Sequence, residues 1–186
     1  QQELHHRRAV GCNVAGEVFG VMLGWRGFNP QADVGQSRLP RVEGARQHQP
    51  VTEGVCWGCH NPHGSDYYRM LQASYPEPFY ARFDADNYQP CFTCNDSRTF
   101  LYERTSELTG FRTGDRNLHF LHVNKSTKGG VCKTCHGVHG ADQKKLVKSK
   151  IPGFGRWEIP IYIQEGAGGT TCTVGCHKPK TYTPLQ

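Results

Sequence analysis

The sequence predicts a mostly irregular chain with short helices wrapped around a core that is only partly protein. Leu, Ile, Val and Phe make up about 19% of the 186 residues, near the level at which a chain lacks the apolar surface needed to fold. The 22 glycines and 11 prolines interrupt regular elements. Nine cysteines, most of them in closely spaced pairs, indicate that covalently held groups supply the missing core.

Three of the cysteine pairs are followed at once by a histidine. This pattern is typical of c-type haem attachment, in which two thiols add to the vinyl groups of the porphyrin and the adjacent histidine binds the iron. The third pair has one extra residue between its cysteines. The three motifs are Cys56, Cys59 and His60; Cys132, Cys135 and His136; and Cys172, Cys176 and His177.

A fourth pair, Cys91 and Cys94, is followed by Asn95 and gains its meaning from an internal duplication. Residues 54–76 align without a gap onto residues 130–152, with GVC, CH, HG, an Asp and a final Pro in both copies. A second cysteine pair follows in each copy, so Cys91 and Cys94 correspond to Cys172 and Cys176. We therefore expect four haems stacked within the chain, of which the one at Cys91 and Cys94 takes its iron ligands from elsewhere.

The duplication also predicts the organisation of the chain. Residues 1–47 form an N-terminal arm and possible assembly segment, residues 48–117 a first dihaem repeat and residues 118–186 a second, the two repeats making one compact haem-cored unit. Short helices are expected to begin near Ser65 and Ala141, after each His-Gly. Turns are expected at 84–87 and 113–116, and a short strand at 159–163, where apolar residues alternate.

The supply of histidine favours iron bound by two imidazoles, because the chain has ten histidines and only two methionines. His63 and His139 lie three residues after a motif histidine, too close to reach the opposite face of the same haem, so each is expected to serve a neighbouring haem. His48 and His122 precede the first motif of each repeat and are the expected distal ligands. His119, one helical turn before His122, is the candidate for the haem at Cys91 and Cys94.

Simpler interpretations of these histidines remain open. His63 and His139 could be surface residues in a turn, and His119 could be structural. His5 and His6 lie on the N-terminal arm, where they are either exposed terminal residues or ligands that reach a haem of another subunit. The arm also holds Cys12, whose simpler role is that of a small buried residue or free thiol.

Other roles for the cysteines and the charge are weaker. Zinc knuckles usually lie about 12 to 20 residues apart, closer than these pairs, and disulfide-exchange folds need a strand–helix pattern that is missing here. The net charge of +6 is matched by haem propionates, and no long Lys/Arg block suggests nucleic-acid binding.

The most apolar stretch, residues 9–25, is too short and polar to span a membrane. We expect a mature, exported chain without a leader.

These motifs resemble those of the multihaem c-type cytochromes with doubled CxxCH motifs. Cys-x-x-Cys-His-x-x-His-Gly occurs twice, and the second copy is preceded by Asn117-Leu118-His119-x-x-His122-Val123. Within this group the chain is most similar to the tetrahaem cytochromes that polymerise into extracellular filaments in metal-reducing bacteria and archaea. The resemblance implies a stack of low-spin haems with at least one axial histidine donated across a subunit boundary. Asn95 and the longer motif at Cys172 depart from the family pattern.

The expected function is electron transfer without catalysis, because two imidazoles close both faces of each iron. The expected partners are neighbouring copies of the chain and redox-partner cytochromes or an extracellular electron acceptor, with secretion to the cell surface or beyond. A soluble periplasmic shuttle is the first alternative. A multihaem oxidoreductase is the second, and its open iron could lie only at Cys91 and Cys94.

Overall fold

The computed structural model describes residue 44, residues 46–153 and residues 156–184, which fall within one unit that runs from residue 43 to the end of the chain. Predictions made for the arm, including those for His5, His6 and Cys12, lie outside the described residues. Strand β1 (Arg46–Gln47), at the end of the predicted arm, pairs antiparallel with β4 (Gly140–Ala141) of the second repeat. The amide of His48 in the first repeat bonds to the carbonyl of His139 in the second at 2.9 Å. The two repeats are therefore joined through backbone hydrogen bonds.

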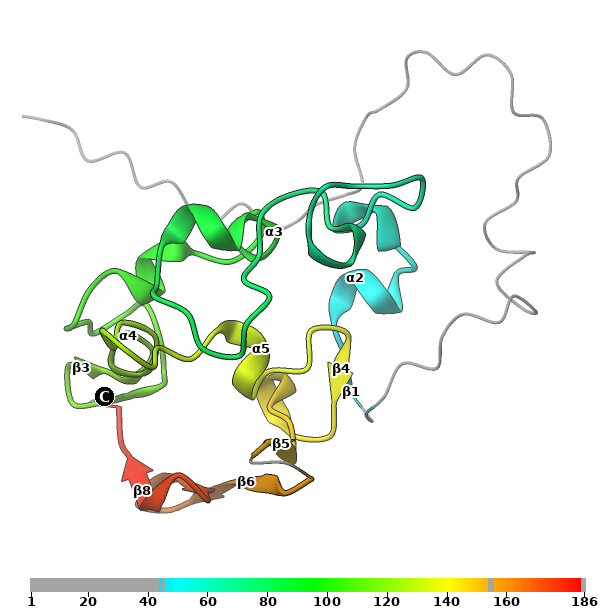
Figure 1. Ribbon diagram of the computed structural model, residues 1–186. Helices are drawn as coiled ribbons and strands as arrows, with labels where there is room; N and C mark the ends of the chain where they lie inside the picture. The colour runs from blue at the N-terminus through cyan, green and yellow to red at the C-terminus, as the bar shows by residue number, and fades with distance from the viewer. Residues whose placement is uncertain (1–43, 45, 154–155, 185–186) are drawn as a thin grey trace, which may run out of the picture. The chain divides into compact units, whose positions relative to one another are not determined.

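The helices are short, as expected for this composition (Figure 1). None of the described α-helices exceeds six residues, and most of the remaining turns are single 3₁₀ turns. The α-helices are α2 (Gln49–Thr52), α3 (Gln89–Phe92), α4 (Leu118–Val123) and α5 (Cys132–Cys135), and the 3₁₀ turns are η1 (Cys56–Gly58), η2 (Tyr68–Met70), η3 (Ala85–Tyr88), η4 (Ser97–Phe100) and η5 (Lys144–Leu146). No helix in the described ranges has the length and apolar character needed to cross a membrane.

The prediction of helices beginning near Ser65 and Ala141 is wrong. Ala141 lies in strand β4, and the segments after each His-Gly contain only the three-residue turns η2 and η5. Both turns are unwound by two consecutive residues with positive φ, a conformation that cannot propagate a right-handed helix. The expected turns are confirmed: Asp84 caps η3, and residues 113–116 close the hairpin of β2 (Arg112–Thr113) and β3 (Arg116–Asn117).

The structure contains a four-stranded antiparallel sheet, of which the sequence predicted only one strand. It is formed by β5 (Lys150–Pro152), β6 (Glu158–Gly166), β7 (Gly169–Val174) and β8 (His177–Tyr182) in the order β5-β6-β7-β8 (Figure 1). The expected strand at 159–163 lies within β6, where Ile159 and Ile161 are buried while Tyr162 is exposed. With Ile151 they form a small core against which Cys172 packs, so the sheet places this motif cysteine beside apolar side chains.

The duplication predicted from the sequence is reproduced in the backbone. The amide of Asn61 bonds to the carbonyl of Met70 at 2.8 Å, and Gly137 bonds to Leu146 at 2.8 Å at the matching positions. Two further matched bonds run from Gln72 to Cys59 and from Lys148 to Cys135, again both at 2.8 Å. The segment that follows each first motif therefore folds back on it in the same way in both repeats.

The second cysteine pairs of the two repeats differ in conformation. Cys91 lies in helix α3, which has Pro90 in its first turn. Cys172 lies in β7, and the chain turns through Cys176 into β8, with a register irregularity between Cys172 and Val174. The extra residue and the β-branched Thr and Val around Cys172 account for the strand. The sequence correspondence between the two pairs does not extend to their local fold.

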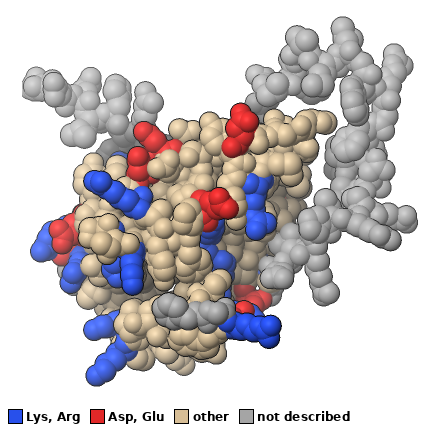
Figure 2. Space-filling view, in the orientation of Figure 1, with Lys and Arg blue, Asp and Glu red and all other residues tan. Residues whose placement is uncertain are grey.

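The surface in view carries charges of both signs. Figure 2 shows Lys and Arg interspersed with Asp and Glu on this face, without a continuous basic stripe. Ion pairs at the surface include Arg98 with Asp96, at 2.6 Å, and Arg104 with Asp115, at 2.7 Å. Exposed pairs of this kind contribute little to stability.

Candidate haem sites

In three of the four motifs the chain winds into a tight turn of its own. The backbone amide of the residue after the second cysteine bonds to the carbonyl of the first cysteine at 3.0 Å in each, for His60 with Cys56, Asn95 with Cys91 and His136 with Cys132. A single turn brings both thiols and the next side chain close together, as attachment to one porphyrin requires. Asn95 therefore stands in the same local structure as the motif histidines.

Five of the histidine rings that the structure describes are held through Nδ1. In four of them the partner is a backbone carbonyl, which can only accept, so the proton lies on Nδ1 and Nε2 keeps its lone pair. Such a bond is the usual way in which a metal-binding histidine is oriented. The bonds join His60 to Arg69 at 3.0 Å, His136 to Lys145 at 2.9 Å, His122 to Leu118 at 2.6 Å, His177 to Lys178 at 2.7 Å, and His119 to the Thr109 hydroxyl at 3.1 Å.

Two pairs of histidine rings, of which all but His139 are held through Nδ1, are spaced as two ligands of one metal would be. The ring centroids of His60 and His139 are 5.9 Å apart, and those of His119 and His136 are 6.5 Å apart. With metal–nitrogen bonds of about 2 Å and each nitrogen about 1 Å from its ring centre, two axial imidazoles would have centroids about 6 Å apart. Ordinary aromatic pairs also occur at this distance. In each pair one ring, that of His60 or His136, has its proton on Nδ1 and therefore a free Nε2 that could bind a metal.

The first of these pairs joins the two repeats. His139 belongs to the second repeat and His60 to the first, and the amide of His48 bonds to the carbonyl of His139 at 2.9 Å. The second pair lies within one repeat. The contact of His119 with His136 differs from the expectation that His119 serves the haem of Cys91 and Cys94.

His122 lies in the neighbourhood of His177. The pKa of His122 is lowered by burial and by the nearby charges of Lys125 and His177. Phe111 stacks on the His122 ring, with centroids 5.6 Å apart, and meets the His119 ring edge-on at 5.1 Å. Sequence reasoning missed Phe111 and Thr109 because nothing in the motifs marks them.

Burial keeps these imidazoles neutral. It lowers the pKa of His119 to about 4, with further contributions from His136 and His122. The pKa values of His136 and His139 are also lowered, chiefly by burial. Because neutral imidazole is the form that binds metal, the packing favours the ligating state.

Thiols of different motifs lie next to each other. Cys91 and Cys132 share a hydrogen bond, which lowers the pKa of Cys91 and, together with burial, raises that of Cys132. Burial and the neighbouring Cys172 raise the pKa of Cys135 to about 11. The second, third and fourth motifs are thus brought together through their sulfur atoms.

Cys94 and Asn95 set the Cys91 motif apart. The Asn95 amide donates to the carbonyl of Cys91 at 2.9 Å, so this side chain folds back on its own helix. Cys94 is disulfide-bonded, whereas Cys91 is a free thiol. Attachment of a porphyrin through Cys94 requires prior reduction of that disulfide, because addition to a vinyl group consumes a thiol.

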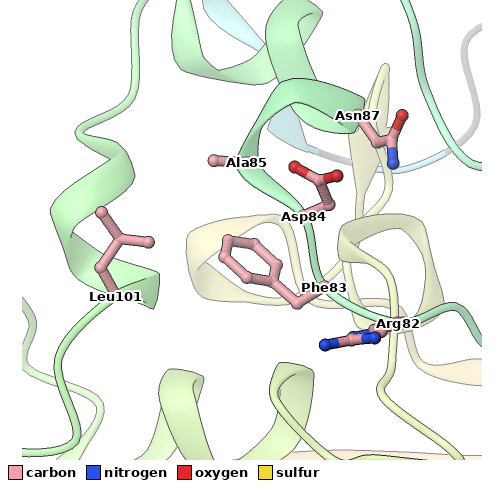
Figure 3. A pocket seen from close by; sticks show the side chains of 6 residues that line it. All are labelled: Arg82, Phe83, Asp84, Ala85, Asn87 and Leu101. Atoms are coloured by element: carbon pink, nitrogen blue, oxygen red, sulfur yellow. The ribbon is translucent and has the colours of Figure 1, made fainter.

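A cavity of about 530 Å³ lies in the same region (Figure 3). Leu101 lines one side, and Phe83 and Asp84 line the side opposite to it. Phe83 also stacks on Tyr88, with centroids 5.4 Å apart, and contacts Phe92 of helix α3 at 6.5 Å. The volume is in the usual range for ligand sites, and the cavity adjoins the aromatic cluster that packs around α3.

The remaining described histidines are less constrained. His63 is exposed, and within the described residues its ring has no hydrogen bond or ring contact. His48 is half-buried, and its charge contributes to the lowered pKa of His139. The part of the chain that the structure describes contains no group of three or more His, Cys, Asp or Glu side chains able to hold a metal ion.

Comparison with known families agrees with the motifs. Residues 48–98 and 124–154 match the family model described as the doubled CXXCH motif. No curated protein and no solved structure matches the chain. The first matched segment includes Cys91 and Cys94, and the second ends before Cys172. The doubled motifs indicate covalently bound c-type haem and support a multihaem c-type cytochrome that transfers electrons.

Proposed function

We propose that this chain is a tetrahaem electron carrier in which histidines bind iron in pairs. The observation that carries the proposal is that two motif histidines held through Nδ1, His60 and His136, each lie beside a second histidine ring, with centroids 5.9 and 6.5 Å apart. The proposed pairs are His60 with His139, His136 with His119, and His177 with His122, and the haem at Cys91 and Cys94 would take its ligands from the remaining histidines. The proposed attachment residues are Cys56 and Cys59, Cys91 and Cys94, Cys132 and Cys135, and Cys172 and Cys176.

When bound, haem supplies reversible one-electron chemistry at its iron. The residues of the chain determine how that chemistry is used. An imidazole on each side of the site leaves no position for a substrate, which favours electron transfer over catalysis. The carbonyls of Arg69 and Lys145 orient His60 and His136 and increase their basicity, which favours a low potential.

The thiol contacts support a close series of sites. Cys91 touches Cys132, and Cys135 lies near Cys172. Since each sulfur would be joined to a porphyrin edge, contacts between thiols of different motifs support short separations between successive groups. The Cys91 site has no motif histidine, so it is also the place where a multihaem oxidoreductase would keep an iron open to substrate.

A haem count combined with carbon monoxide binding tests this proposal. We expect four haems per chain by pyridine haemochrome, low-spin absorption bands, and no new band when the reduced protein is exposed to carbon monoxide. Intact-mass measurement identifies whether Cys94 carries a thioether. Three haems would remove the Cys91 site from the proposal, and carbon monoxide binding by one haem in four would favour the oxidoreductase.

We further propose that copies of the chain polymerise outside the cell and conduct electrons to an external acceptor. Support comes from the repeat symmetry of His63 and His139. His139 lies beside a histidine of the other repeat, whereas the matching His63 is exposed and has no ring partner among the described residues. His63 is therefore suited to a haem of another copy, with redox-partner cytochromes at the ends of the assembly.

The matched substitutions His63→Ala and His139→Ala separate assembly from internal ligation. His63→Ala is expected to abolish filaments in electron micrographs of the full-length holoprotein. His139→Ala is expected to convert one haem to a high-spin, carbon monoxide-binding form within the single chain. A wild-type holoprotein that stays monomeric at all concentrations would instead support the soluble periplasmic shuttle.

A further inference from the structure

The four non-glycine residues with positive φ in the described chain occupy matched positions in the two repeats. They are Arg69 and Met70 in the first repeat, with φ of 53° and 56°, and Lys145 and Leu146 in the second, both with φ of 56°. Side chains with a Cβ disfavour this left-handed conformation, and two such residues in a row are rarer still. Strained backbone that recurs at one place in both repeats points to a function at that place.

Each left-handed turn supplies the acceptor that holds a motif histidine. The Arg69 carbonyl accepts from Nδ1 of His60 at 3.0 Å, and the Lys145 carbonyl accepts from Nδ1 of His136 at 2.9 Å. The next residue in each turn, Met70 or Leu146, accepts from the amide that follows the histidine, at 2.8 Å in both. In each turn one carbonyl thus binds the ring of the histidine, and the next carbonyl binds the backbone amide that directly follows the histidine.

The orientation of the first carbonyl depends on the left-handed conformation. The peptide plane between Arg69 and Met70 is set by ψ of Arg69 and φ of Met70, and the same holds for Lys145 and Leu146. Moving φ to a negative value rotates the carbonyl away from the imidazole. The sequence predicts a right-handed helix in this segment. In that conformation Nδ1 of the histidine would lose this acceptor.

We propose that these two left-handed turns position the axial histidines and hold the potentials of their haems low. The inference rests on the proposed haem ligation by His60 and His136. The carbonyl fixes the proton on Nδ1, directs Nε2 toward the iron, and makes the imidazole a stronger donor, which stabilises the oxidised metal. Arg69, Met70, Lys145 and Leu146 are thus positioning residues that act through their backbone.

The test compares glycine and valine at an exposed residue in each turn. Met70 is 50% exposed and Lys145 is also exposed, so neither substitution removes a core contact. Glycine accepts positive φ freely, whereas β-branched valine resists it. The holoprotein variants are Met70→Gly, Met70→Val, Lys145→Gly and Lys145→Val, and the glycine and valine members of each pair remove the same side chain.

We expect each valine variant to raise the potential of a single haem in a spectroelectrochemical titration, with the other haems unmoved. The glycine variants keep the wild-type potentials and unfold at the same or a higher denaturant concentration. Nitrogen NMR of the histidine Nδ1–H provides a second readout, since its signal shifts in the valine variants only. Loss of one haem in a valine variant, with retention in its glycine partner, also supports the positioning role.

Two results would overturn the inference. If valine and glycine variants shift the potential equally, the side chain rather than the backbone is responsible. If the valine variants keep all wild-type potentials and the Nδ1–H signal, the turns do not control the ligands. Both results require a wild-type protein with low-spin haem, so a wild-type chain without haem would reject the proposed function instead.

Discussion

The hydroxyl of Tyr88 has no hydrogen-bond partner among the described residues, although its side chain is only 1% exposed. Burial, together with the nearby thiols of Cys132 and Cys91, raises its pKa to about 12, so it stays protonated. A buried polar group without a partner is costly. Tyr75 nearby is different, because its hydroxyl accepts from the Lys133 amide at 2.9 Å.

Tyr88→Phe and Tyr75→Phe therefore form a matched pair. Removing the unpartnered hydroxyl of Tyr88 is expected to leave the free energy of unfolding unchanged or to raise it by up to about 1 kcal/mol, whereas Tyr75→Phe is expected to lower it by about 1 kcal/mol. Urea unfolding of the two variants measures both. A larger loss for Tyr88→Phe than for Tyr75→Phe would mean that a group bound at the Cys91 site accepts from Tyr88.

At this scale the sequence predicted which residues carry the chemistry but not how they associate. Doubled motifs identify Cys56, Cys59 and His60 by spacing alone. The contact of His139 with His60 depends on the two-residue strands β1 and β4, which have no hydrophobic pattern. Sequence spacing therefore predicted that His139 serves a neighbouring haem and could not select His60.

Helix α4 holds two proposed ligands, His119 and His122, and is anchored by one side chain. Asn117 is fully buried and caps the helix, accepting from the amides of His119 at 3.0 Å and Phe120 at 3.3 Å. Its amide donates to the carbonyls of Thr99 at 2.7 Å and Tyr102 at 2.9 Å. One residue thus starts the helix and ties it to the preceding segment.

Asn117→Ala is expected to lower the free energy of unfolding by about 3 kcal/mol, because it removes the cap together with the hydrogen bonds to the carbonyls of Thr99 and Tyr102. Asp96→Ala, which removes a partly exposed cap of η4, is the control and is expected to cost about 1 kcal/mol or less. Denaturant unfolding gives the stabilities, and visible spectra report loss of low-spin character. Equal costs for both variants would contradict the anchoring role of Asn117.

Elements were predictable where a local rule applied. Alternating Ile159, Ile161 and Ile163 predicted part of β6, and Asp84 marked a capped turn. The rest of the four-stranded sheet depends on tertiary pairing of polar strands such as β8 (His177–Tyr182), which has no buried side chain. The left-handed turns were also missed, since neither Gly nor Asn marks them.

Across the molecule, buried histidines make stability depend on pH. An unfolded histidine binds a proton below about pH 6.5, while folded His119 remains neutral down to about pH 4. The unfolded chain then holds more protons, so stability is fully present above pH 6.5 and is lost as pH falls toward 4. His119 alone accounts for a loss on the order of 3 kcal/mol.

The thermal midpoint of the holoprotein is therefore expected to fall between pH 6.5 and 4, together with low-spin absorption. Bound iron would add to this loss of stability at low pH, because a nitrogen that is bound to iron cannot also hold a proton. Calorimetry and visible spectra over this range provide the measurement. A midpoint that changes only below about pH 4 would implicate carboxylates such as Asp96 and Asp115, whose pKa values are lowered by Arg98 and Arg104.

The backbone bond between His48 and His139 brings the second repeat to the first motif. It therefore bears on the order in which the motifs are completed during synthesis. The chain is made from its N-terminus, so Cys56, Cys59 and His60 emerge well before His139. With His139 as the partner of His60, a haem held at the first motif would have only His60 to bind it until the second repeat is made. The earliest motif would thus be completed only once the second repeat is present, and in a chain truncated after the first repeat His60 would lack the ring of His139.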